Sequence, residues 1–548
     1  MAFSAISAQL RRAARTAPAG ASRWLPSRGR SLHAPTRAAA AAADGDAAAA
    51  AAGPAAGAAD AAAAAPGGSP RICVLGGGFG GLYTAVKLET LIWPKGRKPR
   101  VTLVDQGERF VFKPLLYELL NGTAQPWEVA PTFSQLLAPY PVQFVQARVA
   151  EVQPGRPLAG GGSGGGGRVV LEGGGEIEYD WLVIALGAES DPRGVPGVRE
   201  LARPFVTLDD ATHVDARLSA LEAAAAAGGV ERRDGAGLRA PRAVVVGAGY
   251  AGVELASVIG ERVKGRGVEV RVVTPTEDIL PGSPQGQRAA ARDALAGAGV
   301  RVDGGVRVER LGEGGGDGRC VVHLAGANGP SELEADLVVW TAGLAPASKF
   351  VKSLPFPSTA AGAIETDPTL RVLQHARVFA LGDVSFAEQE QEQQQQGSYP
   401  ATAQVAFQQA DYAAWNLWAA INGRPLLPFR YQHLGSMMSL GAANAAVALP
   451  VELPAALADT IRGSPLEGLL SLAGVRAAAP GAVTLEGPLA QLLRRAAYLY
   501  RQPTGEQRLS VAASWLQQAA DVAASAAREL SGRTAPSGGG GGGGGGSA

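Results

Sequence analysis

The sequence predicts an α/β protein with two Rossmann-like dinucleotide-binding domains, the first of them discontinuous, followed by a C-terminal amphipathic helical segment. Three observations predict this fold. A glycine-rich turn between an apolar strand and a helix occurs twice, strands and helices alternate after each turn, and leucines recur at helical spacing near the C-terminus. The length of 548 residues suits two or three domains.

The first glycine-rich turn lies in RICVLGGGFGGLYTAVKLETL, which begins at Arg71. Gly76, Gly78 and Gly81 occupy the glycine positions of a GxGxxG pattern. In this pattern one glycine makes a tight turn, one lets the backbone approach a pyrophosphate, and one lets the helix pack on the strand. Asp105 ends the next strand, where an acidic side chain binds ribose hydroxyls. The first unit therefore predicts a dinucleotide site.

The second glycine-rich turn follows the strand that starts at Pro241, with Gly247, Gly249 and Gly252 in the same pattern. Two such units indicate two dinucleotides, one kept and one exchanged. After the next strand, however, Thr274 replaces the expected acid. Because a carboxylate there would repel a 2′-phosphate, its absence predicts that NADPH is accepted. The alternative is that another residue binds the ribose of NADH.

Composition excludes several other classes of site. The chain has only two cysteines, Cys73 and Cys320, without a nearby partner, which argues against a disulfide framework, a thiolate metal site or a CxxC redox centre. The five histidines are scattered, so we expect no metal. The net charge of +1 gives no global attraction for nucleic acid. No apolar run is long enough for a membrane-spanning helix.

The N-terminal segment is typical of an organellar transit peptide. Residues 1–43 contain seven arginines among Ser and Ala but no Asp or Glu. The alternative is a basic tail without a targeting role. Composition alone does not distinguish a plastid targeting signal from a mitochondrial one.

The ordered part of the chain, about Arg71 to Leu530, resembles the type II NAD(P)H–quinone dehydrogenases. The motifs that carry the resemblance are RFVFKPLLYELLNG, ALGAES, VVWTAGLAP, VFALGDVS and TAQVAFQQA. WPKGRKP, AAINGRPLLPFRYQ and LGSMMSLG are most similar to the plastid branch, whose members are linked to plastoquinone and to demethylphylloquinone reduction in vitamin K₁ synthesis. The family's members are flavoproteins that hold FAD in the first unit.

The resemblance implies an activity and a setting. Hydride would pass from NADH or NADPH to FAD, and a membrane quinone would then take two electrons, without proton pumping and without protein thiols. The protein would lie on a plastid membrane or a lipid-globule surface, with the mitochondrion as the alternative, and a homodimer is an open option. Two rival functions remain: a soluble reductase for another acceptor, and a non-enzymatic flavin redox sensor of the apoptosis-inducing-factor kind.

The resemblance also assigns roles to single residues. Asp383 would hold a ribityl hydroxyl of FAD, and Lys113 would lie near the flavin ring. Glu254 would reach the nicotinamide–flavin stack, and Gln404 and Gln408 would border flavin and quinone on one helix face. The alternatives are a surface lysine, a solvated helix glutamate and exposed polar glutamines. Two further glycines complete the predicted cofactor contacts: Gly187 in ALGAES and Gly343 in VVWTAGLAP.

The segment Leu485–Pro503 predicts an amphipathic helix with Arg494, Arg495 and Arg501 beside its apolar stripe. Arginines and tyrosines on such a helix suit the headgroup level of a membrane or lipid droplet, so we expect peripheral binding. The alternative is a helix pair packed on the protein's own core or on a dimer partner.

These features predict six segments. In chain order they are a transit peptide and Ala-rich linker (1–66), the first part of the FAD domain (67–202), the NAD(P) domain (203–363), the second part of the FAD domain (364–450), a membrane-associating region (451–532) and a glycine-rich tail (533–548).

Overall fold

The structure, a computed structural model, describes residues 69–155, 166–231, 237–315, 319–346, 348–387, 399–452, 474–476 and 482–533. Three segments lie outside the described residues: the predicted transit peptide and linker, the Gln-rich run Glu388–Gln396, and the glycine-rich tail after Arg533. The boundaries between the predicted domains stay predictions.

The first parallel sheet has the strand order β21-β7-β1-β2-β3. Its strands are β1 (Arg71–Leu75), β2 (Arg100–Asp105), β3 (Val142–Gln146), β7 (Trp181–Ile184) and β21 (Val378–Ala380). They are rich in β-branched residues and largely buried, as expected for a parallel sheet covered on both faces. Because β21 comes from far along the chain, this sheet is discontinuous in sequence, as predicted.

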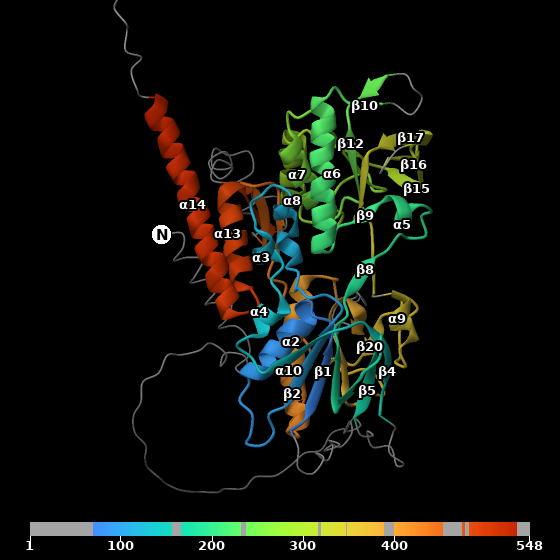
Figure 1. Cartoon of the computed structure of the whole chain (residues 1–548), viewed down its shortest axis with the longest axis vertical. Coiled ribbons are helices and arrows are strands. Elements are labelled where there is room, and N and C mark those ends of the chain that lie inside the picture. Colours follow the sequence, from blue (N-terminus) through green and yellow to red (C-terminus); the bar gives the residue numbers. More distant parts are fainter. Residues whose placement is uncertain are drawn as a thin grey trace, which may run out of the picture. The chain divides into compact units, whose positions relative to one another are not determined.

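Two helices cover one face of this sheet. α2 (Phe79–Thr90) follows the first glycine turn directly, and α10 (Ala403–Ile421) packs along it (Figure 1). Between β2 and β3 the chain forms the short helices η1 (Lys113–Leu119), α3 (Pro126–Val129) and α4 (Phe133–Leu137). Asp383 lies in η2 (Gly382–Val384), immediately after β21.

The second parallel sheet repeats the arrangement with the order β14-β13-β12-β18-β9. Its strands are β9 (Arg203–Pro204), β12 (Arg242–Val246), β13 (Glu269–Val273), β14 (Arg301–Asp303) and β18 (Leu337–Trp340). The associated helices are α6 (Leu208–Ala226), α7 (Tyr250–Val263) and α8 (Gln285–Gly297), and α7 follows the second glycine turn.

Smaller antiparallel sheets accompany the two parallel ones. They are β4–β5–β6 (Val149–Gln153, Gly167–Leu171, Glu176–Tyr179), β15–β16–β17 (Val306–Glu313, Cys320–Gly326, Gly329–Ala335), β8–β19 (Ala188–Ser190, Leu344–Pro346) and β10–β11 (Val230–Glu231, Leu238–Arg239). A separate two-stranded sheet pairs β20 (Ile364–Thr366) with β22 (Ser385–Ala387) in parallel. Two short helices, α5 (Val198–Leu201) and α9 (Ser348–Ser353), complete this part. Residues 156–165 of the glycine-rich connection between β4 and β5 are not described.

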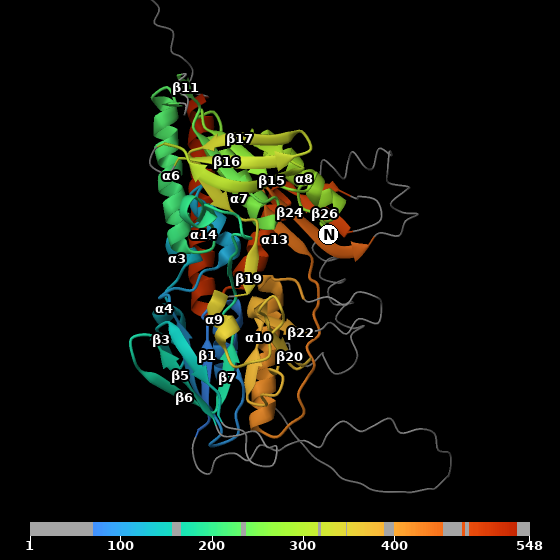
Figure 2. The same ribbon diagram turned by 90° about the vertical axis from the view of Figure 1, so that its right-hand side faces the viewer.

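The C-terminal region contains a sheet that the sequence did not predict. β23 (Ser436–Ser439), β24 (Ala445–Glu452), β26 (Ala482–Glu486) and β25 (Val475–Arg476) pair in that order, and β24 and β26 pack against α8 (Figure 2). α13 (Gly487–Tyr500) and α14 (Gly505–Arg533) follow. Leu485 therefore belongs to β26, and the predicted helix starts two residues later. No described helix is long and apolar enough to cross a membrane.

Candidate functional site

The first glycine turn has the geometry of a phosphate-binding loop. Gly76 has a φ of +94°, and a Cβ on it would overlap the Ala185 carbonyl at the end of β7. A Cβ on Gly81 would overlap the Gly76 carbonyl oxygen, so this glycine lets α2 begin close to β1. Gly78 is the N-cap of α2 and faces open space. A pyrophosphate can therefore approach the free N–H groups at this helix N-terminus.

The second turn repeats this geometry. Gly247 has a φ of +108°, and a Cβ on it would lie 2.9 Å from Thr341 Oγ1 beside β18. A Cβ on Gly252 would overlap the Gly247 carbonyl oxygen, whereas Gly249, the N-cap of α7, faces open space. The two turns thus have equivalent backbone geometry on two different sheets.

Backbone hydrogen bonds define which other residues are equivalent. The Gly76 and Gly247 amides each donate, over 2.8 Å, to the carbonyls of Val104 and Val273 respectively. The residues that follow, Asp105 and Thr274, therefore hold the same strand-end position. The Ala185 and Thr341 amides likewise donate to Leu75 and Val246 at the ends of β1 and β12, which makes Gly187 and Gly343 equivalent.

The two glycines of that last pair differ in surroundings. Gly187 has a φ of +71° and faces open space. A Cβ on Gly343 would lie 2.5 Å from Arg193 Nε, so the chain itself covers this position. Only Gly187 is open toward a ligand in this geometry, and the predicted contact of Gly343 with a cofactor stays a prediction.

Asp105 is positioned toward the first turn. Its carboxylate accepts hydrogen bonds from the Gly77 amide (2.6 Å) and the Gly107 amide (2.7 Å). Burial raises the pKa of Asp105, and these two N–H donors oppose that rise. The carboxylate therefore lies beside the phosphate-binding loop, where the ribose of a dinucleotide would meet it.

Thr274 is instead engaged within its own loop. It is buried, and its Oγ1 lies 2.9 Å from Thr276 Oγ1, which donates to the Asp278 carbonyl. Arg271, the basic residue nearest along β13, makes two 2.7 Å hydrogen bonds to Asp303 and is not directed at a 2′-phosphate. No strand-end carboxylate occupies the second unit.

The structure brings Lys113 and Asp383 close enough for their charges to interact. Burial raises the pKa of Asp383, and Lys113 opposes this shift. Asp383 lines a cavity of about 360 Å³ together with Ala188, Tyr399 and Gln409. A larger cavity of about 630 Å³ lies elsewhere, along the C-terminal parts of α7 and α8, and contains none of the predicted site residues.

Gln409 is a site residue that sequence reasoning missed. Its buried side-chain carbonyl accepts a 2.7 Å hydrogen bond from the Gly382 amide and so fixes the turn that presents Asp383. The sequence contained a signal, since Gln409 directly follows Gln408 in TAQVAFQQA, but helical spacing favoured the pair four residues apart.

Gln404 and Gln408 hold a loop rather than point freely at a ligand. Gln404 accepts from Tyr431 Oη (2.6 Å) and the Leu434 amide, and it donates to the Gly435 carbonyl. Gln408 exchanges two hydrogen bonds with the backbone of Gln432. Their polar atoms already have partners, and their predicted contact with flavin and quinone stays a prediction.

Glu254 is buried in α7, so its alternative interpretation as a solvated helix glutamate is wrong. Its carboxylate accepts a 2.8 Å hydrogen bond from the Ser439 amide. Burial raises its pKa to about 7, opposed by the Ser439 N–H and the nearby cation of Arg494, and supported by Glu118. A carboxyl with this pKa can exchange a proton near neutral pH.

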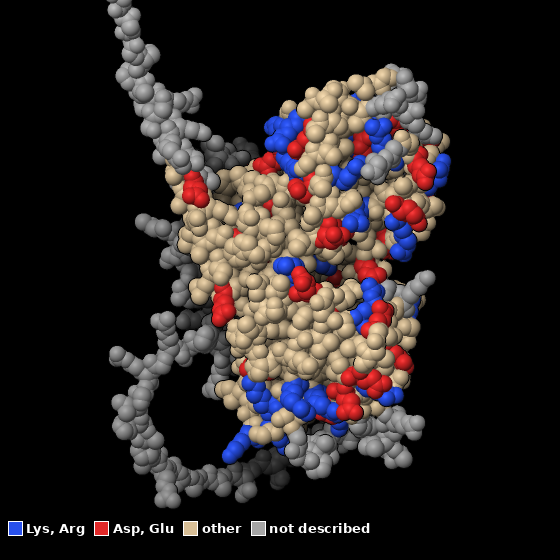
Figure 3. Space-filling view, in the orientation of Figure 1, with Lys and Arg blue, Asp and Glu red and all other residues tan. Residues whose placement is uncertain are grey.

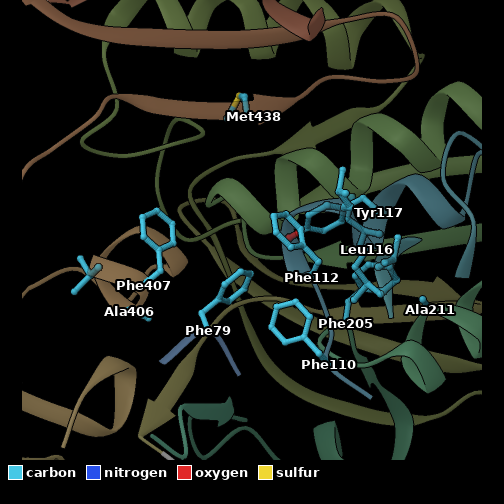
Figure 4. Close-up of a cluster of buried hydrophobic side chains, with 14 of the residues drawn as sticks. Phe79, Phe110, Phe112, Leu116, Tyr117, Phe205, Ala211, Ala406, Phe407 and Met438 are labelled. Carbon is cyan, nitrogen blue, oxygen red and sulfur yellow. The ribbon is translucent and has the colours of Figure 1, made fainter. Parts of the chain in front are cut away.

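A cluster of aromatic side chains lies beside the first turn. Phe79, the first residue of α2, packs against Phe110 and Phe112 with ring centroids 5.3 Å apart in each case (Figure 4). Phe407 of α10 and Tyr83 of α2 extend the cluster, with centroids 6.4 Å apart. The cluster therefore gives the first glycine turn an apolar neighbourhood on the side of Phe79.

The expectation that Arg494 meets lipid headgroups is wrong. Its side chain is 0 % exposed and forms an ion pair with Glu118, which Arg495 also contacts at 3.2 Å. Arg501 lies 3.9 Å from the centre of the Phe407 ring. The guanidinium groups turn inward because buried Glu118 and the aromatic cluster provide their partners. Apolar side chains are exposed instead: Leu489, Leu492, Tyr500, Leu509 and Leu516.

The described residues contain no group of His, Cys, Asp and Glu side chains that could hold a metal. Both cysteines are buried and free, and burial raises the pKa of each thiol to about 12. Neither thiol is therefore available as a nucleophile beside the glycine turns.

Comparisons with known proteins agree with this geometry. Residues 70–410 match the model of the family described as pyridine nucleotide-disulphide oxidoreductase. A relative from Arabidopsis thaliana, named alternative NAD(P)H-ubiquinone oxidoreductase C1, chloroplastic/mitochondrial, is 43% identical over 82% of this chain and 81% of its own. A protein of Synechocystis, named demethylphylloquinone reductase NdbB, is 36% identical over 82% of this chain and 96% of its own.

Among solved structures, NDH2 from Plasmodium falciparum in complex with NADH superimposes with a TM-score of 0.62. The alignment covers 82% of this chain and 98% of that chain at 17% identity, and it therefore supports the fold alone.

Proposed function

Because the chain belongs to the pyridine nucleotide-disulphide oxidoreductase family, and within it to the type II NAD(P)H–quinone oxidoreductases, we propose that it binds FAD and transfers electrons from NADH or NADPH to a membrane quinone. The balanced reaction takes NAD(P)H, a proton and a quinone to NAD(P)⁺ and a quinol. Two electrons and two protons reach the quinone, and no proton is pumped.

The first glycine turn and Asp105 are the residues that would hold FAD. The open position beside Gly78, the free N–H groups of α2 and the carboxylate of Asp105 fit a pyrophosphate and a ribose. Gly187 and Asp383 would contact the flavin end, where Gln409 fixes the turn at Gly382. FAD bound there would supply the ring that accepts a hydride and releases electrons to a second substrate.

The second glycine turn would hold the exchanged nicotinamide dinucleotide. Its loop matches the first one residue by residue, but it lacks a strand-end acid to repel a 2′-phosphate. We therefore propose that NADPH is used as well as NADH. Glu254, buried on the helix that starts at this turn, would hold or release a proton during the reaction.

The observation that carries the proposal is the combination of two matched dinucleotide turns with buried, unreactive cysteines. Disulfide reduction in this family would need a thiol pair beside the flavin, and both thiols of this chain are buried and unpaired. Direct transfer from the flavin to an external acceptor is the chemistry that remains.

We propose a quinone of the plastid, plastoquinone or a demethylphylloquinone-like naphthoquinone, as that acceptor. This assignment is supported by the plastid-type motifs and by the names of the two relatives. Peripheral attachment to a plastid membrane or lipid globule would come from the exposed apolar side chains of α13 and α14. In Figure 3 the part of the face on the left, where α13 lies, shows few charged side chains.

Steady-state oxidation of NADH and NADPH against a panel of quinones tests this function. We expect turnover with both nicotinamides and release of FAD on denaturation. Release of FMN contradicts the cofactor assignment. Slow NADH oxidation with a lasting charge-transfer band indicates a redox sensor, and turnover with a ferredoxin-like protein but no quinone indicates a soluble reductase.

Flotation with liposomes tests the membrane attachment. Replacing Leu492, Leu509 and Leu516 with glutamine should reduce flotation while reduction of water-soluble quinones continues, because the exposed apolar area is lost and the fold is not. Ile92→Gln is the matched control, since this side chain is 90 % exposed but lies after α2. Unchanged flotation, together with loss of a dimer, assigns the surface to a second copy of the chain.

A further inference from the structure

A buried ion pair joins the C-terminal helix α13 to the segment before α3. Arg494 and Glu118, 376 positions apart, have side chains that are 0 % and 1 % exposed. Gln491 accepts from Arg494 Nε at 3.0 Å and donates to the Ala442 carbonyl at 3.1 Å. The guanidinium is thus held from two sides, and the arrangement exists only when α13 is docked.

Stability alone does not explain this pair. Removing two charges from water is costly, and buried ion pairs are often replaced by apolar residues without loss of stability. The position of the pair is more informative, because the loop that Gln491 contacts follows β23, and the amide of Ser439 at the end of β23 donates to Glu254. α13 is therefore connected to the carboxylate on the second fingerprint helix.

Among the described residues, the charged and titratable side chains that interact electrostatically with Glu254 belong to α13 and η1. α13 contributes Arg494 and Tyr498, and η1 contributes Glu118 and Tyr117. Arg494 favours the carboxylate form of Glu254, and Glu118 disfavours it. The larger of these two opposing effects is that of Arg494.

We propose that Arg494, held by Glu118, is a positioning residue of the site: on the docked helix α13 its cation favours the carboxylate form of buried Glu254 and so adjusts this carboxyl for proton exchange. The inference rests on the proposed function, since the role of Glu254 in the reaction is part of it. α13 and its connection to α14 then have a second role besides presenting an apolar surface.

The first fingerprint helix supports this role of the α13 segment. Tyr83 lies two residues after Gly81, as Glu254 lies two residues after Gly252. The Tyr83 hydroxyl donates to the carbonyl of Arg501, the C-cap residue that directly follows α13. The α13 segment therefore contacts Tyr83 in the first unit through Arg501, and it acts electrostatically on Glu254, at the equivalent position of the second unit, through Arg494.

The test is the pH dependence of flavin reduction by NADH in single turnovers without oxygen or quinone. Arg494→Gln should move the midpoint of this pH profile, which reports the pKa of Glu254, upward by roughly one pH unit, because a neighbouring cation is lost. Glu118→Gln should move it downward. The neutral double variant Glu118→Gln/Arg494→Gln leaves no unpaired charge and should move it upward by less than Arg494→Gln alone.

Three controls make the outcome specific. Arg494→Lys keeps the cation and should give a midpoint near that of the wild type. Arg508→Gln removes a matched arginine on α14 and should not change the midpoint. Glu254→Gln should remove the titration. A merely structural role predicts shifts in the same direction for Arg494→Gln and Glu118→Gln, or no shift, and either result overturns the inference. Wild-type protein whose flavin is not reduced by NADH overturns the proposed function instead.

Discussion

The two glycine turns share one backbone geometry but end in different chemistry. In each unit the first glycine donates to the residue before the strand-end position, and the third glycine packs on the carbonyl of the first. The strand-end residue is Asp105 in one unit and Thr274 in the other. The shared glycine geometry suits the pyrophosphate, which every dinucleotide contains. The strand-end residue, which would meet the ribose, differs between the two sites.

A second difference lies on the helices that follow the turns. The position two residues after the third glycine is Tyr83 in α2, within an aromatic cluster, and Glu254 in α7, beside a buried ion pair. The first unit therefore has apolar rings beside its glycine turn, which would suit a group that stays bound. The second unit buries a carboxyl with a pKa of about 7, which suits a ligand that exchanges during a proton-coupled reaction.

The largest expected effect comes from the third glycine of each unit. A Cβ on Gly81 or Gly252 would overlap a carbonyl oxygen and force α2 or α7 away from its strand. Gly81→Ala should cost at least about 3 kcal/mol of stability and prevent flavin retention. Gly252→Ala should retain flavin but weaken NADH binding by on the order of 100-fold, or ~3 kcal/mol. Flavin content and NADH titrations measure both effects.

The middle glycines provide the matched control. Gly78 and Gly249 have φ values of −74° and −75° and open space at the Cβ position. Alanine there should leave the unfolding free energy nearly unchanged and affect only ligand binding. The assignment is contradicted if Gly78→Ala unfolds the protein while Gly81→Ala retains flavin. In that case Gly78, and not Gly81, would be needed for the packing of α2 on its strand.

An intermediate effect is expected from the buried carboxyl of α7. The folded-state pKa of Glu254, about 7, lies above its unfolded value near 4.5, so ionisation opposes folding as pH rises through this window. Glu254→Gln should therefore be more stable than wild type at pH 8 by on the order of 2–3 kcal/mol, and equally stable below about pH 4.5. Urea unfolding at several pH values measures this difference.

Glutamine keeps the acceptor for the Ser439 amide, so that hydrogen bond is not a variable in the comparison. A stability gain that is the same at every pH would show that Glu254 does not titrate in this window. Tyr83→Phe at the equivalent position of α2 removes no charge and should show no such pH dependence.

The sequence was sufficient for features encoded within about thirty neighbouring residues. Strand, turn, helix and strand-end acid follow each other in the chain, so Gly76, Gly81 and Asp105 could be assigned from spacing. The ion pair between Glu118 and Arg494 could not, because it depends on the packing of segments that lie far apart. Read locally, Arg494 belongs to an amphipathic helix; only the fold shows that it is buried.

The sheet of β23, β24, β25 and β26 was missed for a related reason. Three of its strands, β23, β25 and β26, have five residues or fewer, and β23 and β24 consist largely of Ser, Met and Ala, so no clear alternation of polar and apolar residues marks the sheet. The roles of Gln404 and Gln408 illustrate the same limit. Their spacing predicted a common helix face, but it could not show that the loop 431–435 would occupy their amides.

The smallest expected effect concerns the strand-end position itself. Thr274 is equivalent to Asp105, whose carboxylate reaches the Gly77 amide in the first turn. Thr274→Asp should therefore place a carboxylate beside Ala248, where it can bind ribose hydroxyls but repels a 2′-phosphate. NADPH binding should weaken about tenfold, or ~1.4 kcal/mol, while NADH binding changes by less than about threefold. Thr274→Val loses the contact with Thr276 without adding charge and should leave the ratio of the two dissociation constants unchanged. Equal weakening of NADH and NADPH binding by Thr274→Asp would show that this position does not face the ribose. The strand-end positions of the two units would then not be equivalent in ligand binding.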